Sequence, residues 1–131
     1  MEAYVDDIEE ATEDNEDFRR VLHTGTHLQL VLMALQPGEA IGEQLHEDRD
    51  QFFCVEAGEG EILIDGKRHA IEDDFAALVP AGTRYDVIAT GDEPLKLYAL
   101  CAPPGEREEV VHRRESQAEA AAEHDEGETP E

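Results

Sequence analysis

With 131 residues, the chain has room for one domain whose own hydrophobic core can hold it together without disulfide bonds. Its 34 acidic residues outnumber 10 basic ones, and the formal net charge is −24. Such a surface repels nucleic-acid phosphates and anionic lipids, because binding to either needs clustered lysine and arginine. Nucleic-acid-binding and membrane-binding functions are therefore excluded.

Residues 1–17 form an acidic arm for which a short helix or no regular structure is expected. From Phe18 onward, short β-like runs alternate with turn signals, a spacing typical of sandwiches and barrels. The expected strands are residues 18–22, 27–35, 41–46, 51–56, 61–64, 67–71, 75–79, 85–89 and 95–101. Asp65-Gly66 is typical of type I′ hairpin turns, whose two central residues both need positive φ. The pattern predicts an all-β closed barrel or jelly roll, which hides its sheet edges.

The expected barrel spans residues 18–112, and residues 113–131 form a second acidic segment, the C-terminal tail. Alanines and glutamates favour a helix over about Ser116–Glu123. The last residues have the composition of disordered chain. Helix, coil and an arm that docks on a partner all stay open for this tail.

Acidic residues are found in the expected barrel as well as at both ends of the chain. Those in the barrel include Glu39, Glu43, Glu47, Asp48, Asp50, Glu56, Glu59, Glu61, Asp73 and Asp74. Lys67 and Lys96 are the only lysines. An acidic, lysine-poor body resembles proteins from cells that hold molar salt, where the Debye length is ~3 Å and self-repulsion is muted. We therefore expect a salt-adapted, halophilic protein; a merely solvated acidic surface is the alternative.

Cys54 and Cys101 are the only cysteines, and each lies in an apolar run outside any CxxC pattern. Two free buried thiols are favoured over a disulfide, although the sequence does not tell whether the two lie near each other. The N-terminus MEAYVDDIEE lacks the basic and apolar regions of a signal peptide. No apolar run approaches the ~20 residues of a transmembrane helix, so a cytoplasmic protein is expected.

Two segments resemble the paired motifs of the cupin superfamily. The first family motif has a glycine, five residues, His-x-His, a Glu or Gln about five residues on, and a later glycine. In this chain Gly38 and Gly58 hold the ends of that motif. Gln44, His46 and Gln51 stand at its ligand positions.

The second segment, residues 74–85, matches the family's glycine, five residues, Pro-x-Gly, two residues and histidine, with two departures. Asp74 replaces the glycine, and Tyr85 stands where the histidine is expected. The likeness covers about residues 18–112, and PGEAIGEQLHEDRDQFF and GDEPLKLYALCAPP are similar to the same regions of small single-domain cupins. The resemblance implies a double-stranded β-helix, the jelly-roll barrel of cupins.

In cupins the residues at these positions converge inside the barrel and hold a divalent metal. By this resemblance Gln44, His46 and Gln51 are the candidate ligands for Mn, Fe, Ni or Zn, and Tyr85 is the candidate catalytic residue; all four would line one pocket. Residues 44 and 46 share one face of a strand, and residue 51 is expected on the next strand, across a hairpin. Amide oxygen is a weak ligand, and tyrosine binds well only as phenolate. Compared with the small single-domain cupins that the chain resembles, Gln44 replaces a carboxylate and Tyr85 replaces a histidine. Both changes remove metal affinity, so a bound metal and an empty site both stay open.

Three functions are compatible with such a site, because the fold alone does not decide among them. The favoured one is a barrel pocket that binds a small metabolite without metal. The second is a metal-dependent enzyme, isomerase- or dioxygenase-like, acting on a small polar substrate. The third is a non-catalytic dimeric structural or interaction protein. Whether the protein is an enzyme, and on which substrate or reaction, stays open.

Two further features concern partners. Arg84 would meet an anionic substrate at the barrel mouth or, as the simpler alternative, form a surface ion pair. The apolar run Leu28–Leu35 suits an interface buried on both faces of the sheet. Because small cupins commonly pair their outer sheets, we expect a homodimer that binds a small molecule.

Overall fold

The computed structural model describes residues 3–104 and 111–112, and all structural findings below concern those residues. In chain order their elements are α1 (Ile8–Asp14), β1 (Arg19–Thr24), β2 (Gln29–Leu35), β3 (Gln44–Leu45), β4 (Asp50–Ala57), β5 (Glu59–Ile64), β6 (Lys67–Glu72), β7 (Ala76–Val79), β8 (Arg84–Ala89), β9 (Leu95–Ala102) and β10 (Val111–His112). The predicted tail, residues 113–131, lies outside the described residues, as does the helix expected within it.

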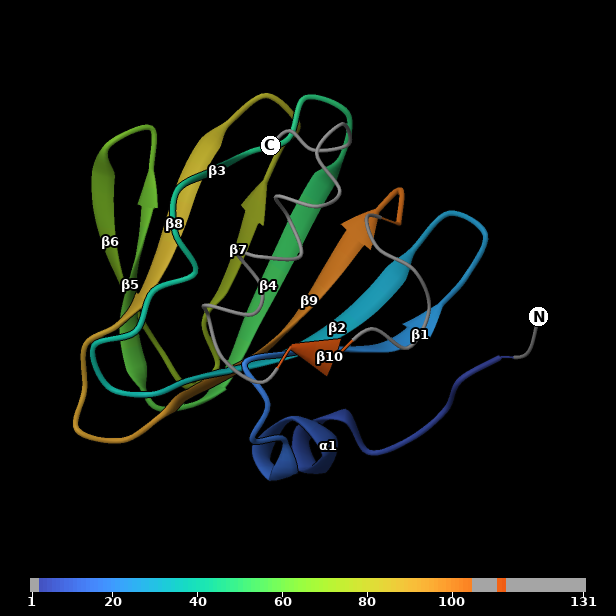
Figure 1. Ribbon diagram of the computed structural model, residues 1–131, viewed down its shortest axis with the longest axis horizontal. Helices are drawn as coiled ribbons and strands as arrows, with labels where there is room; N and C mark the ends of the chain where they lie inside the picture. The colour runs from blue at the N-terminus through green and yellow to red at the C-terminus, as the bar shows by residue number, and fades with distance from the viewer. Residues whose placement is uncertain (1–2, 105–110, 113–131) are drawn as a thin grey trace.

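The strands form two antiparallel sheets (Figure 1). The larger sheet has six strands in the order β10-β1-β2-β9-β4-β7, and the smaller has four in the order β3-β8-β5-β6. Strands far apart in the sequence are neighbours: β9 lies between β2 and β4, paired with both along nearly its whole length. This interleaving of early and late strands in two facing sheets confirms the predicted jelly-roll barrel.

The core lies between the two sheets. Along β9 the odd-numbered residues are buried and the even-numbered ones are half-buried, as the two-residue period of a strand requires. One hydrophobic cluster includes Val31 and Leu97 from the larger sheet and Ile62 and Val87 from the smaller sheet. Each sheet therefore turns one face inward, and the side chains of that face are in a position to form an internal site.

The strand expected at residues 41–46 is much shorter than predicted. Only Gln44–Leu45 forms a strand, and Ala40 adds an isolated bridge to Ile88. Gly42 explains the break, because its φ of 90° is outside the extended region, and its N–H donates to the Asp86 carboxylate at 3.0 Å instead of to a strand. The prediction that residue 51 lies across a hairpin from residue 44 is also wrong, since β3 and β4 belong to different sheets.

Two turns contain aspartates in the left-handed region of the backbone, and the sequence predicts the geometry of the first. Asp65 and Gly66 have φ of 52° and 85°, which confirms the I′-type hairpin between β5 and β6. Asp74, which replaces a motif glycine, has φ of 73°. Aspartate is among the few residues that enter this left-handed region readily, so the turn survives the substitution.

The described part of the N-terminal arm contains a helix. Asp7 caps α1 by accepting a hydrogen bond from the Glu10 N–H at 3.1 Å. The helix packs against β9 and β4, buries Thr12, and its Glu13 carbonyl accepts from Lys96 Nζ at 2.6 Å. No helix among the described residues is long and apolar enough to cross a membrane.

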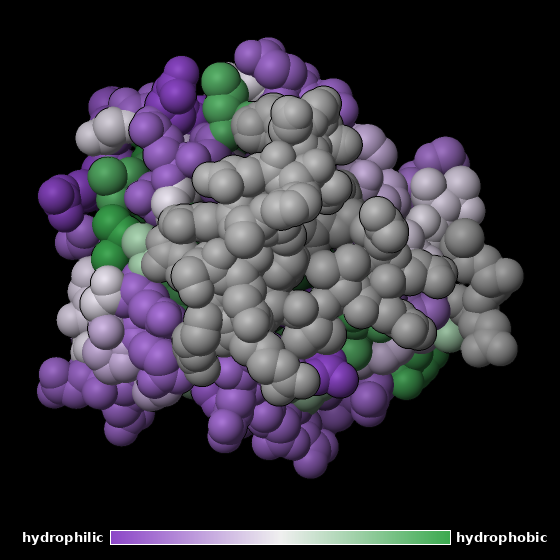
Figure 2. All heavy atoms as spheres, viewed as in Figure 1, coloured by the Kyte–Doolittle hydropathy of each residue, from purple (hydrophilic) through white to green (hydrophobic). Residues whose placement is uncertain are grey.

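The two cysteines are free thiols, as the sequence favoured, and they lie on the neighbouring strands β4 and β9. Cys101 on β9 is buried, and Cys54 on β4 is half-buried. Alternation along the strands places Cys101 on the inner face of the sheet with Gln51, and Cys54 on the outer face with Tyr98. The outer surface of the molecule is mainly hydrophilic in the described part of the view in Figure 2, with small separate hydrophobic areas.

Candidate functional site

The four residues singled out from the sequence are here called the polar cluster: Gln44, His46, Gln51 and Tyr85. Gln44 on β3 and Tyr85 on β8 are direct partners in the register of the smaller sheet. His46 follows β3 immediately, and its ring centroid lies 6.1 Å from that of Tyr85. Gln51 comes from the larger sheet and lies on the same face of β4 as Phe53. The ring centroid of Phe53 is 5.6 Å from that of Tyr85. The two sheets thus place the cluster at one end of the barrel interior.

Backbone hydrogen bonds connect the two motif segments beside the cluster. The His46 carbonyl accepts from the Gly82 N–H at 2.8 Å. The Asp50 carboxylate accepts from the Ala81 N–H, also at 2.8 Å. Asp50 is exposed, as its alternation with Gln51 along the strand predicts. These contacts position His46 and the start of β4 against the turn that precedes Tyr85.

Tyr85 is a neutral phenol. Only 5% of the residue is exposed, and this burial raises its pKa above the ordinary 10.0 because it disfavours the phenolate. The positive charges of Arg19 and Arg49 act in the opposite direction without overcoming burial. At neutral pH the Tyr85 hydroxyl can therefore donate a hydrogen bond, but it is not the anionic ligand that a metal needs.

His46 is neutral as well. Burial, followed by the charges of Arg49 and Arg19, lowers its pKa from 6.5 to about 4, against a small opposing effect of Asp48. Its Nδ1 atom is buried and has no hydrogen-bond partner among the described residues. A buried polar atom without a partner costs about 1–3 kcal/mol, so this nitrogen indicates a place where a further group would bind.

Gln51 has a partner that sequence reasoning missed. Its side-chain oxygen accepts a hydrogen bond from the Cys101 thiol at 3.2 Å, and both residues are buried. The two are cross-strand neighbours on β4 and β9. The alternating pattern of residues 95–101 indicated that Cys101 could face inward, but no local signal joined it to residue 51.

Two arginines near the cluster were also missed. Arg19 on β1 is the register partner of Met33, a core residue, so its side chain lies on the inner face of the larger sheet. Arg49 directly precedes β4; its side chain is 16% exposed, and Asp48, 3.5 Å away, is 73% exposed. The arginine that was named, Arg84, is instead exposed and lies 3.6 Å from a Glu43 carboxylate oxygen, which agrees with the surface ion-pair alternative.

The donor set of the cluster does not fit the divalent metal that the fold implies. His46 is one good ligand, but the Gln51 amide oxygen is a weak one that already accepts a hydrogen bond from Cys101, and the Tyr85 phenol stays protonated. The nearby guanidiniums of Arg19 and Arg49 also repel a cation. A neutral imidazole, two weak amides and a phenol beside positive charge form a poor transition-metal site.

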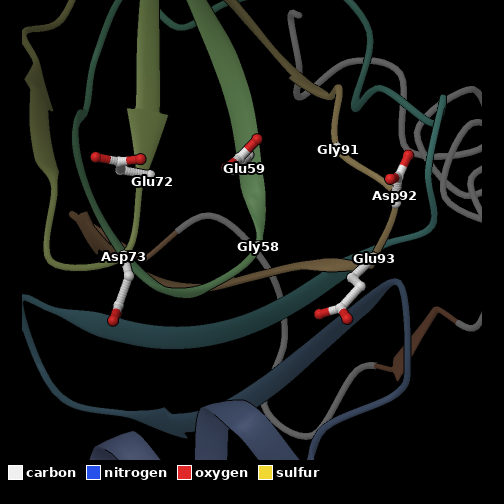
Figure 3. Close-up of a pocket in the computed structure, with 7 residues that line it drawn as sticks. All are labelled: Gly58, Glu59, Glu72, Asp73, Gly91, Asp92 and Glu93. Atoms are coloured by element: carbon white, nitrogen blue, oxygen red, sulfur yellow. The ribbon is translucent and has the colours of Figure 1, made fainter.

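A separate acidic cavity lies at the other end of the barrel (Figure 3). Its volume is about 420 Å³, and it is lined by Gly58, Glu59, Glu72, Asp73, Gly91, Asp92 and Glu93. These residues lie at or after the ends of β4, β6 and β8, whereas Gln51 and Tyr85 lie near the starts of β4 and β8. The polar cluster and this cavity are therefore distinct, and sequence reasoning did not single out the cavity as a site.

Among the described residues, three carboxylates next to this cavity lie close enough together to hold a cation. The ligand atoms of Glu56, Asp73 and Asp74 lie within 4.8 Å of one another. Burial, and then the repulsion of neighbours that include Glu9 and Asp73, raises the pKa of Glu56. Asp73 and Asp74 are exposed, and such acidic surface groups are common in a chain of net charge −24.

Known proteins resemble this chain over most of its length. Residues 31–102 match the family model described as cupin domain. YrkC of Bacillus subtilis is 43% identical over 124 residues, which cover 90% of this chain and 67% of that protein. L612 of Acanthamoeba polyphaga mimivirus is 37% identical over 114 residues, covering 80% of this chain and 71% of that protein.

A solved structure agrees with both the sequence match and the fold. The crystal structure of BH2720 from Bacillus halodurans has a TM-score of 0.88 and 42% sequence identity to this chain. The match covers 91% of this chain and 95% of that one. With the paired motifs, the two facing sheets, a family model that spans more than half of the sequence and these relatives in agreement, the chain belongs to the cupin family.

Proposed function

We propose that this protein binds a small polar metabolite at the polar cluster and does so without a resident metal. The observation that supports this function most directly is the buried Nδ1 atom of His46, which has no partner among the described residues. Water or a ligand normally satisfies such an atom, because leaving it unpaired is costly. A ligand with hydrogen-bonding groups would remove that cost on binding.

The other members of the cluster suit such a ligand. Gln44 and His46 are half-buried, so a molecule from solvent can reach them, while Tyr85 lies deeper. The neutral phenol donates, the amide of Gln44 donates and accepts, and neutral imidazole offers one N–H and one lone pair. Few convergent polar groups against an apolar core are typical of small-molecule sites.

The enzyme alternative has weaker support. A general acid works best with a pKa near the working pH, and burial moves the pKa of Tyr85 away from neutrality. We therefore assign Tyr85 the role of a hydrogen-bond donor. The metal-dependent alternative would also need a better donor set than this cluster offers, as argued above.

A thermal-shift screen of small metabolites on the full chain tests the proposed function. A ligand that binds only the folded state stabilises it by mass action, by about 2.7 kcal/mol at a concentration of a hundred times Kd, and so raises the melting temperature. The rise should occur in the parent and in His69→Ala, a control at an exposed histidine of β6, and should be lost in His46→Ala. The proposal would be contradicted if no metabolite stabilised the parent, or if every metabolite that did so stabilised His46→Ala equally.

We also propose that the outer face of the larger sheet joins two copies of the chain. Four apolar side chains from neighbouring strands form a row across this face, in the order Leu78, Phe52, Leu100 and Leu30. Each is the register partner of the next in the row. Alternation places all four on the face opposite the core, and Leu78 is 64% exposed. Two copies of a chain of net charge −24 repel each other, so an uncharged row is where contact is least unfavourable.

A further inference from the structure

The arginines at the surface and those near the polar cluster have different surroundings. Arg20 lies 3.0 Å from a carboxylate oxygen of Asp17, and Arg68 lies 2.6 Å from one of Glu61. Both arginines are exposed, at 49% and 68% of their side chains, so these are ordinary surface ion pairs. The Arg49 side chain is only 16% exposed. Its Nε atom lies 3.5 Å from a carboxylate oxygen of the exposed Asp48, but this atom is buried and has no hydrogen-bond partner among the described residues.

Arg19 lies in β1 of the larger sheet, and Arg49 lies in the loop directly before β4. Arg19 shares the inner face of β1 and β2 with Met33, and Arg49 directly precedes Gln51's strand. Their charges act on both titratable members of the cluster: they oppose protonation of His46, and they favour ionisation of Tyr85. The charges of both arginines therefore act on the cluster, although the whole chain has a net charge of −24.

We propose that the ligand of the polar cluster is a small oxyanion, a metabolite with a carboxylate or phosphate group, and that Arg49 and Arg19 balance its charge. This inference rests on the proposed function and names the chemical class of the ligand. Guanidinium groups match the geometry of carboxylate and phosphate oxygens and form strong charge-assisted hydrogen bonds with them. Tyr85 and neutral His46 add uncharged donors for the remaining oxygens.

The acidic surface does not prevent such binding in salt. At ~1 M salt the Debye length is ~3 Å, so an anion is insensitive to most of the exposed carboxylates. Charges at a partly buried site are screened much less, so the arginines retain their effect there. An acidic exterior with a positive internal site also disfavours nonspecific anion binding elsewhere on the molecule.

Calorimetric titration of the full chain at fixed ionic strength tests the inference. The probes are malonate, inorganic phosphate and malonamide, which is the uncharged analogue of malonate. We expect malonate or phosphate to bind, and malonamide to bind at least about tenfold more weakly, because the charge-assisted bonds are lost. Which of the two anions binds more tightly distinguishes a carboxylate from a phosphate ligand.

Variants identify the residues responsible. Arg49→Gln and Arg19→Gln should each weaken anion binding at least about tenfold. Arg20→Gln is the matched control, since Arg20 is next to Arg19 but pairs with Asp17 at the surface, and it should keep the parent affinity. Arg49→Lys should recover part of the affinity because it keeps the charge, which a purely structural defect would not explain. Thermal unfolding of each variant checks that it folds.

The outcomes separate this inference from the proposed function. Anion binding that survives both arginine substitutions, or malonamide binding as tight as malonate, overturns the inference alone. The same holds if no oxyanion binds while a neutral metabolite stabilises the parent in a His46-dependent manner. If neither anions nor neutral metabolites bind, both the inference and the proposed function are wrong.

Discussion

Cys101 donates its thiol hydrogen to the side-chain oxygen of Gln51 across 3.2 Å, in the buried inner layer of the larger sheet. Cys101→Ala removes that donor and leaves a buried acceptor unsatisfied, which should lower the free energy of unfolding by about 1–3 kcal/mol. Gln51→Met removes the acceptor while keeping a similar volume. In the Gln51→Met background, Cys101→Ala should lower the free energy of unfolding by less than it does in the parent. A double-mutant cycle, measured by chemical denaturation, gives this difference. Equal costs in the two backgrounds would show that the hydrogen bond contributes nothing.

His46 should make stability fall with acid. Its folded pKa of about 4 lies below the ordinary 6.5, because burial and the charges of Arg49 and Arg19 disfavour the cation. The unfolded chain therefore binds a proton that the folded chain does not, and this contribution to stability is lost as pH falls from 6.5 toward 4. Stability differences between parent and His46→Gln isolate the effect from that of the carboxylates. A difference that does not vary with pH over this window would contradict it.

The outer apolar row predicts the oligomeric state. Leu78→Glu places a carboxylate on the row and should convert a dimer into a monomer in sedimentation velocity, because it adds like charges at the contact. Val5→Glu is the control, since Val5 is 94% exposed and lies in the arm, away from the row. A parent that is monomeric, or a Leu78→Glu variant that remains dimeric, would exclude this face as the interface.

Salt should stabilise the protein. Raising KCl from about 0.1 M to about 1 M shortens the Debye length from ~10 Å to ~3 Å and weakens repulsion among the excess carboxylates. We expect the melting temperature to rise by several degrees. Asp73→Asn, which removes one charge from the group of Glu56, Asp73 and Asp74, should stabilise the protein at low salt and have less effect at high salt. A melting temperature that falls or stays level with KCl would argue against salt adaptation.

The weak donor set predicts that the protein binds transition metals poorly. Elemental analysis of untagged protein purified in high salt should find far less than about one equivalent of Mn, Fe, Ni or Zn, because neutral amides and a phenol are poor ligands. Tyr85→His supplies a second imidazole at the family's histidine position and should increase metal content. Near-stoichiometric metal in the parent that disappears in His46→Ala would instead support the metal-dependent enzyme.

Much of this protein could be read from the sequence because the relevant signals are local. Alternating polar and apolar residues in runs such as 95–101 indicate strands, since side chains on a strand alternate between two faces. Asp65-Gly66 indicates its turn through the φ values that it tolerates. The resemblance of two segments to the paired cupin motifs implied that Gln44, His46 and Tyr85 lie together.

Only the tertiary structure decided what surrounds them. Gln51 meets Cys101 because β4 and β9 pair across 50 positions of sequence, and Arg19 faces the interior because its register partner is Met33. Alternation within one strand indicates which of its residues share a face, but it does not indicate which residue of a distant strand each of them meets. The inward position of Arg19 therefore depends on the register between strands, whereas the composition alone indicated only an acidic protein.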